Sequence, residues 1–410
     1  MVEKVWLHGL VCGMAVTCVI GGSLYYAEQG KLPFIGDNLG TGESAKKLAT
    51  IEKLIDKEYL GEIDKEVLED YMYYGLVAGL GDKYSQYFTV EQYAESTQNS
   101  DGAYVGIGIV LQQDTETQTI WVTECYENSP AQKAGVLEGD VLYQVNDYPA
   151  SENTLSELLE LPIWDKDEVT LYLQREGVEE ILELKVKIGK VEVPSVYSRI
   201  LENSMGYIQI TQFTEVTPSQ FETAYRNLLE AGIQGLMIDL RDNPGGLLSS
   251  VCKTIKQILP EGLILYTEDA NGKREEYKSL GETPIEIPLV VLVNENSASA
   301  AEVFSGAVKD YEIATLVGTT TFGKGIVQKI FPFKDGSALK LTIAKYYTPK
   351  GTNIHGVGIS PDIEVEWAGD EKFTTPSDYY KLEQKDWETK DNQFEKAVEV
   401  LSDLILQVKE

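Results

Sequence analysis

Residues 291–306 read VLVNENSASAAEVFSG, and the stretch changes character in its middle. An apolar run typical of a buried strand ends near Asn294, and a helical pattern begins after Ser299. The residues between them have little side-chain bulk, which lets another backbone approach closely. At such a strand-to-helix turn, unpaired amides and the positive end of the helix dipole converge and can stabilise an oxyanion. The plainer interpretation is a helix capping box made by Ser299 and Glu302.

The segments around this stretch alternate strands with helices. Apolar runs at GYIQIT, GLMIDL and PLVVLVN precede helical patterns near residues 219–231, near residues 247–259 and after Ser299. This alternation predicts an α/β core, which we place at residues 191–370. A C-terminal helical segment at residues 371–410 carries an apolar stripe of Phe394, Val398, Leu401, Ile405 and Val408. The stripe predicts packing on another helix, either within the chain or in a homodimer.

Two further regions precede the core, so the chain is predicted to be a multidomain α/β (α+β) protein. Helical periodicity predicts an N-terminal helical region at residues 44–101, and short alternating strands predict a β-rich module at residues 102–190. In that module Val105, Gly106, Ile107 and Gly108 place exposed amides between apolar strand positions. Such amides can capture the terminal carboxylate of a peptide that adds as an extra strand, although an ordinary glycine-containing strand is the alternative.

The N-terminus contains an apolar run at residues 5–27, with Lys4 before it and Glu28 after it. Its length suits a bilayer span, so we predict a single-pass membrane signal anchor at residues 1–28 and a linker at residues 29–43. A cleaved signal peptide is the alternative, but Tyr25 occupies a position where a cleavage site needs a small residue. We therefore expect the body of the protein outside the cytoplasm.

Composition excludes several classes of function. The chain has 410 residues, of which 35 are basic and 66 acidic, and its net charge of −31 would repel a nucleic-acid backbone. Its four cysteines, two of them in the apolar N-terminal run, form neither a disulfide framework nor a metal cluster pattern. The sequence has no HExxH motif, and His355 is its one histidine beyond that run. We expect no metal, no other cofactor and no nucleic-acid partner.

A nucleophilic serine needs a base, and the sequence offers two. A Ser-His-Asp arrangement would have to use His355, whereas a Ser-Lys arrangement needs a lysine in an apolar setting. Lys324 stands in TTTFGKGIVQ, between glycines and before a β-branched run, where burial would favour the neutral amine of a general base. In a strand, Gln328 would share a face with Lys324 and could hold the amine. An ordinary surface lysine in a glycine turn is the alternative.

The stretch GLMIDLRDNPGG, residues 235–246, predicts a strand that ends at a tight turn. Pro244 fixes the backbone there, and Gly245 and Gly246 leave amides exposed at a helix start. These amides could share an oxyanion with the amide of Ala300. Many α/β proteins contain such a turn, so its weight depends on the other motifs.

Taken together and in this order, these motifs resemble the carboxyl-terminal processing peptidases, or tail-specific proteases, which are serine endopeptidases with a Ser-Lys dyad. DLRDNPGG, NENSASAAE and FGKGIVQ match the core motifs, and YVGIGIVL with SPAQKAGVLEGDVLYQVND looks like a PDZ domain. The resemblance implies that Ser299 is the nucleophile, Lys324 the general base and Gln328 its orienting partner. It also implies an oxyanion hole at the amides of Gly245 and Ala300.

The resemblance implies a fold with an N-terminal helical region and a PDZ-like module inserted before a crotonase-like α/β protease core. The implied function is cleavage of extracytoplasmic proteins near or from their C-termini, at a bacterial cell membrane, with the PDZ-like module binding substrates that have apolar C-termini. The same resemblance makes His355 a structural residue. A catalytically silent PDZ scaffold is the alternative, and the presence of Ser299, Lys324 and Gln328 argues against it.

Overall fold

The computed structural model describes residues 42–114, 116–368 and 391–409. The predicted anchor, residues 1–28, and most of the predicted linker, residues 29–43, lie outside these ranges. Within them, none of the helices combines the length and the apolar character needed to cross a bilayer. The chain divides into two compact units, Met1–Glu95 with Val327–Ala344 and Ser96–Ile326 with Lys345–Glu410.

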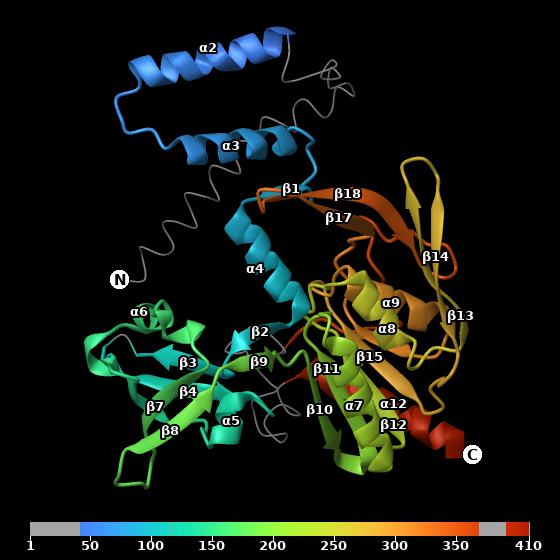
Figure 1. Cartoon of the computed structure of the whole chain (residues 1–410). Helices are drawn as coiled ribbons and strands as arrows, with labels where there is room; N and C mark the ends of the chain where they lie inside the picture. The colour runs from blue at the N-terminus through green and yellow to red at the C-terminus, as the bar shows by residue number, and fades with distance from the viewer. Residues whose placement is uncertain (1–41, 115, 369–390, 410) are drawn as a thin grey trace. The chain divides into compact units, whose positions relative to one another are not determined.

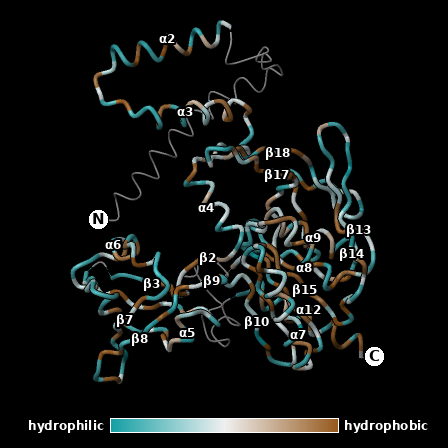
Figure 2. The backbone as a smooth tube through the Cα atoms, in the orientation of Figure 1, coloured by the Kyte–Doolittle hydropathy of each residue, from teal (hydrophilic) through white to brown (hydrophobic). Residues whose placement is uncertain are grey.

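The first unit contains the predicted helices and a small sheet. Helix α2 (Gly42–Glu58) buries no residue and shows hydrophilic and hydrophobic positions in turn along its length (Figure 2). Helix α3 (Lys65–Ala78) is capped by the side chain of Asp64, and α4 (Val90–Asp101) follows. Strand β1 (Gln86–Phe88) pairs antiparallel with β18 (Ala338–Tyr347), which also pairs with β17 (Ile326–Pro332). Because β18 completes this sheet, residues 327–344 belong with the N-terminal helices and not with the core, where we predicted them.

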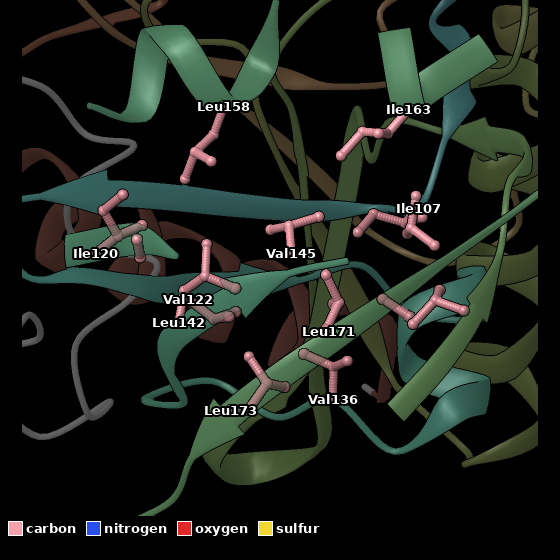
Figure 3. Close-up of a cluster of buried hydrophobic side chains, with 14 residues drawn as sticks. Ile107, Ile120, Val122, Val136, Leu142, Val145, Leu158, Ile163, Leu171 and Leu173 are labelled. Atoms are coloured by element: carbon pink, nitrogen blue, oxygen red, sulfur yellow. The ribbon is translucent and has the colours of Figure 1, made fainter. Parts of the chain in front are cut away.

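The predicted β-rich module forms two sheets, and we call residues 103–192 the β module. Strand β2 (Ala103–Gly106) pairs with β9 (Gly189–Glu192), and the larger sheet has the order β3-β4-β5-β7-β8, with β6 beside β5. Its other elements are β3 (Ile109–Gln113), β4 (Ile120–Cys125), α5 (Pro130–Ala134), β5 (Val141–Val145), β6 (Tyr148–Pro149), η1 (Ala150–Glu152), α6 (Leu155–Leu159), η2 (Pro162–Asp165), β7 (Glu168–Gln174) and β8 (Leu182–Lys187). The core of the β module consists of aliphatic side chains from the strands of this sheet, from the segments between them and from α6 (Figure 3).

The stretch YVGIGIVL is two strands, although its pattern predicts one. Strand β2 ends at Gly106 and β3 begins at Ile109, so a turn separates them. Gly108 in this turn has a φ of +84°, which a residue with a side chain adopts only with strain. The turn packs on the start of α5, since the Ile107 carbonyl accepts a hydrogen bond from the Ala131 amide at 2.9 Å.

The α/β core contains a sheet with the order β10-β11-β12-β15-β16-β19, in which the strands from β11 onward run parallel. Its strands are β10 (Val196–Leu201), β11 (Met205–Ile210), β12 (Gly235–Asp239), β15 (Leu289–Val293), β16 (Thr315–Gly318) and β19 (Ile363–Glu364), and the short helix η3 (Glu202–Ser204) lies between the first two. All residues of β11, β12 and β15 are buried, as expected for parallel strands covered on both faces. This confirms the predicted mixed α/β core.

Each of these three buried strands is followed by a helix, as the alternation predicts (Figure 1). The helices are α7 (Thr217–Glu230), α8 (Leu248–Ile255) and α9 (Ala300–Asp310), and a β hairpin of β13 (Glu261–Asp269) and β14 (Arg274–Leu280) lies between α8 and β15. In β11, Tyr207 contacts Phe394 of α12 (Asn392–Lys409), whereas a side chain at Gly206 would meet Leu228 of α7. Since neighbouring strand residues point to opposite faces, α7 and α12 cover opposite faces of the sheet.

Helix α12 packs on the sheet, so the prediction that it packs on another helix is wrong. Phe394, Leu401 and Ile405 are buried in one cluster with side chains of β11, β12, β15 and β16. The predicted stripe ends there, because Val408 is 70% exposed. At the start of this helix Asp391 forms a buried ion pair at 2.8 Å with Arg241, which follows β12.

Candidate active site

Ser299 stands at the junction between the buried strand β15 and helix α9. Its backbone has φ 56° and ψ −112°, outside the conformations that L-residues commonly adopt. Conformations of this kind persist where surrounding contacts over-determine them, and they gather at functional sites. Contacts from neighbouring residues therefore hold Ser299 in this conformation.

Glu302, in the first turn of α9, supplies the central contact. Its side chain is fully buried, and its carboxylate accepts four hydrogen bonds. Oxygen Oε2 accepts from the Ser299 and Lys324 amides, both at 2.8 Å. Oxygen Oε1 accepts from the Thr321 hydroxyl and the Gly323 amide, both at 2.7 Å. A buried carboxylate is tolerated when its lone pairs are filled in this way.

The shared oxygen Oε2 brings together two residues that are far apart in the sequence. Because the amide nitrogens of Ser299 and Lys324 both bind it, their backbones are immediate neighbours. The sequence predicts Glu302 as part of a capping box, and the hydrogen bond from the Ser299 amide to the Glu302 carboxylate confirms that half of the box. The bonds to residues 321–324 were missed, because no local pattern links α9 to a loop about twenty residues later.

Lys324 lies in a loop just before β17, as its position before a β-branched run predicts, so it does not occupy a strand position on the same face as Gln328. Its side chain is half-buried. The glycines beside it are required by close backbone contacts: a side chain at Gly325 would come within 2.6 Å of the His355 amide nitrogen. On the other side, the Gly323 carbonyl accepts a hydrogen bond from the Gly356 amide at 2.9 Å. The segment around His355 thus supports the Lys324 loop through its backbone, and the role of the histidine side chain stays a prediction.

Gln328 belongs to strand β17 and to the first of the two units. Its side-chain amide donates to the Thr342 hydroxyl of β18 at 3.5 Å. Its pairing with the amine of Lys324, which lies in the second unit, stays a prediction.

The turn after β12 packs directly against Ser299. A side chain at Gly245 would come within 2.7 Å of both the Ala298 carbonyl oxygen and Ser299 Cβ, and 2.9 Å from the Ala300 nitrogen. The small residues of the NENSASAAE stretch therefore admit the backbone of the NPGG turn. Gly245 also has a φ of +101°, so both its conformation and its surroundings exclude a side chain.

The amide of Gly245 is already bound, which contradicts its predicted role as an oxyanion donor. It donates at 2.8 Å to the side-chain oxygen of Asn243, whose own amide group donates to the Ile210 carbonyl at 2.7 Å. In the described part of the chain, the amides of Gly246 and Ala300 make no hydrogen bond. Ala300 is nevertheless buried, and a buried amide without a partner is uncommon.

Tyr346 is a further residue at this site, and no motif in the sequence points to it. Its hydroxyl donates to the Ser299 carbonyl at 3.0 Å. Burial, and then the charge of Glu302, hold the pKa of Tyr346 well above its ordinary value, so the phenol keeps its proton. Tyr346 therefore fixes the backbone of Ser299 from the carbonyl side, and Glu302 fixes it from the amide side.

These contacts lie within a segment that matches a known family. A model described as peptidase family S41 matches residues 204–365, which include Ser299, Lys324, Gln328 and the NPGG turn. "Carboxy-terminal processing protease CtpA" of Bacillus subtilis (strain 168) is 34% identical over 355 residues, which are 86% of this chain and 76% of that protein. The chain belongs to peptidase family S41. This peptidase is a serine protease, as the sequence predicts.

Other relatives of the peptidase carry similar names. A carboxy-terminal-processing protease of Bartonella bacilliformis is 34% identical over 338 residues, which are 80% of the peptidase and 77% of the relative. A solved structure of a photosystem II D1 C-terminal processing protease is 25% identical, with a TM-score of 0.46, and covers 86% of the peptidase and 93% of that chain. The β module lies outside the residues that the family model matches.

Proposed function

We propose that the peptidase cleaves proteins near or from their C-termini with a Ser299-Lys324 dyad. The neutral Lys324 amine takes the Ser299 hydroxyl proton as the alkoxide forms a bond to the substrate carbonyl carbon. The resulting lysine ammonium returns a proton to the departing amine as the peptide bond breaks. Water, deprotonated by the same lysine, then hydrolyses the acyl-enzyme, and Gln328 orients the lysine amine.

The observation that supports this proposal is that the Glu302 carboxylate binds the backbones of both Ser299 and Lys324. Its Oε2 atom holds the amides of Ser299 and Lys324 at 2.8 Å each, so the nucleophile and the base start from adjacent backbone positions. Such fixed placement lowers the entropic part of the activation barrier. We assign the oxyanion hole to the amides of Ala300 and Gly246, since each is an unpaired donor within the described residues beside Ser299.

For substrate binding we propose that the β module is a PDZ-like domain. The turn at residues 105–108 would bind the terminal carboxylate, and the substrate tail, with an apolar last residue, would add as a strand along β3. Strand β3 is the end strand of its sheet, which leaves one edge for such pairing within the described residues.

We further propose that residues 1–28 anchor the peptidase in a bacterial cell membrane, with its catalytic body outside the cytoplasm. The support is the apolar run at residues 5–27 and the charged residues that flank it. Alkaline extraction of membranes from cells that express the full chain, or a chain starting at residue 42, tests this. The proposal fails if both chains are released equally.

The dyad is tested by cleavage of an unfolded protein substrate by four variants of the full chain. We expect Ser299→Ala and Lys324→Ala to lose nearly all cleavage, whereas the surface controls Ser249→Ala and Lys350→Ala keep it. The acidic limb of the pH profile of kcat/KM, where activity rises as the base loses its proton, should report the base in the free enzyme, and it should be absent from the residual activity of Lys324→Ala. Equal cleavage by Ser299→Ala and the native chain would leave Ser299 as a helix cap only.

A further inference from the structure

The β module carries a feature at the far end of the proposed substrate groove that the peptidase mechanism does not use. Helix α6 lies beside the outer strand β3, and the Leu155 amide donates to the Gln113 side-chain oxygen at 3.0 Å. Figure 3 shows Leu158 of α6 pointing into the apolar cluster under this sheet, where it is 1% exposed. Helix α6 and the end of β3 are therefore neighbours, and the proposed groove would run between them.

Gln113 fixes the end of this groove. Its side-chain nitrogen donates to the carbonyl and the side-chain oxygen of Gln118, at 3.4 Å and 3.2 Å, across the turn between β3 and β4. With its bond to Leu155, this side chain holds the β3–β4 turn and the start of α6 together. We call this junction the distal end of the groove, because the turn at residues 105–108 lies at the other end of β3.

Four carboxylates belong to the distal end. Asp114 and Glu116 follow Gln113 in the chain, whereas Glu152 and Glu157 flank the start of α6. Backbone amides of Thr117 and Glu116 lower the pKa of Asp114, and Thr154 likewise lowers the pKa of Glu157, so both are ionised at neutral pH. Glu116 and Glu152 are exposed.

Within the described residues, none of these four carboxylates forms an ion pair. The ion pairs of the β module join Arg175 to Asp140 and Lys190 to Glu192. Lys133 lies on α5, which follows β4 and packs beside the turn at residues 107–108 at the opposite end of β3. The distal end is therefore a negative surface that favours a positively charged occupant.

The direction of a bound tail places particular substrate residues there. If the terminal carboxylate sits at residues 105–108, the preceding residues can pair along β3 only by running antiparallel to it. A strand advances about 3.3 Å per residue, so the five residues of β3 are matched by the last five or so residues of the tail. The residues about five to seven positions from the C-terminus then reach the distal end.

We propose that the distal end selects substrate tails that carry lysine or arginine about five to seven residues before an apolar C-terminus. This inference rests on the proposed PDZ-like function of the β module and adds the class of tail that it takes. The occupant is an unfolded, basic polypeptide tail, because the proposed groove offers the edge of β3 along its length and carboxylates without ion pairs at its distal end.

The test measures binding of ten-residue peptides, labelled at the N-terminus with a fluorophore, to the full chain carrying Ser299→Ala. The peptides share the last three residues Val-Ala-Val and differ at the fifth and sixth residues from the end, which are both lysine, both serine or both glutamate. We expect the lysine peptide to bind about fivefold more tightly than the serine peptide at low salt, as two exposed ion pairs would provide. The ratio should shrink as sodium chloride is raised.

Two double variants in the same background locate the effect. Glu116→Gln with Glu152→Gln should bring the lysine and serine peptides to nearly equal affinity. Glu179→Gln with Glu180→Gln, between β7 and β8 on the opposite side of the sheet, removes the same charge and should keep the preference. Equal affinity of the lysine and serine peptides for the starting chain would overturn the inference, and so would an equal loss of preference in both double variants.

Amidated versions of the peptides separate this inference from the proposals on which it rests. We expect amidation to weaken the lysine and serine peptides by the same factor, because the carboxylate site lies at the other end of β3. Amidated peptides that bind as tightly as free ones would overturn both the groove and the preference. The Ser299-Lys324 dyad is judged by the cleavage assay alone and stands or falls independently.

Discussion

Glu302→Gln is the substitution that examines the arrangement of the active site most directly. Each carboxylate oxygen accepts two hydrogen bonds, and all four donors belong to residues 299 and 321–324. A glutamine keeps one oxygen and replaces the other with an NH2 group, so two donors face a donor. An unsatisfied buried donor costs about 1–3 kcal/mol, so we expect a loss of about 2–5 kcal/mol in the free energy of unfolding.

The effect on catalysis should be larger than stability alone explains. Because Glu302 sets the positions of Ser299 and Lys324 together, a shift near 1 Å would lower kcat by about 10²-fold while KM changes little. Steady-state cleavage of a fluorogenic peptide at a temperature where the variant is folded, together with its thermal unfolding, measures both effects. Glu295→Gln is the matched control, since Glu295 is exposed and accepts one side-chain hydrogen bond, from Thr319. A Glu302→Gln enzyme with kcat within twofold of the native value would refute this role.

Three further predictions follow from individual contacts. Gly245→Ala places a methyl group within 2.7 Å of Ser299 Cβ and should lower kcat at least about 10²-fold, whereas Gly232→Ala, with a similar positive φ and open space, should keep full activity in the same assay. Arg241→Met leaves two buried aspartates without a counter-charge and should lower the free energy of unfolding in urea by about 3–5 kcal/mol; a change below about 1 kcal/mol would contradict it. Burial raises the pKa of the Cys252 thiol from 9.0 to about 12, so its contribution to stability is complete below pH 9 and is lost as the pH rises toward 12. A thiol reagent at pH 9 should label Cys252 in urea-unfolded protein and leave it unlabelled in the folded enzyme; rapid labelling of the folded enzyme would disprove this.

Much of the core could be predicted from the sequence because its signals are local. The apolar runs at residues 235–239 and 289–293 are buried strands, and the helices after them begin within one residue of the predicted positions. The glycines around Lys324 and in the NPGG turn mark close backbone contacts, which the structure contains. Local spacing and small residues carry this information directly.

Other features depended on contacts between distant parts of the chain. The apolar stripe of α12 could pack on a helix or on a sheet equally well. In the folded chain it packs on the sheet face formed by β12, β15 and β16. Likewise, the two glycines of the NPGG turn cannot be told apart from the sequence. The folded chain distinguishes them, because the Asn243 side chain accepts a hydrogen bond from the amide of Gly245 and not from that of Gly246.

The family, the α/β core and the candidate dyad can be predicted from the sequence, because each is recorded in short motifs with defined spacing. How Ser299 and Lys324 are brought together depends on the packed fold. A fully buried carboxylate needs several donors, and Glu302 finds them in its own helix turn and in a loop about twenty residues later. No pattern in a single sequence records that meeting, since it exists only once α9 and the loop before β17 are packed.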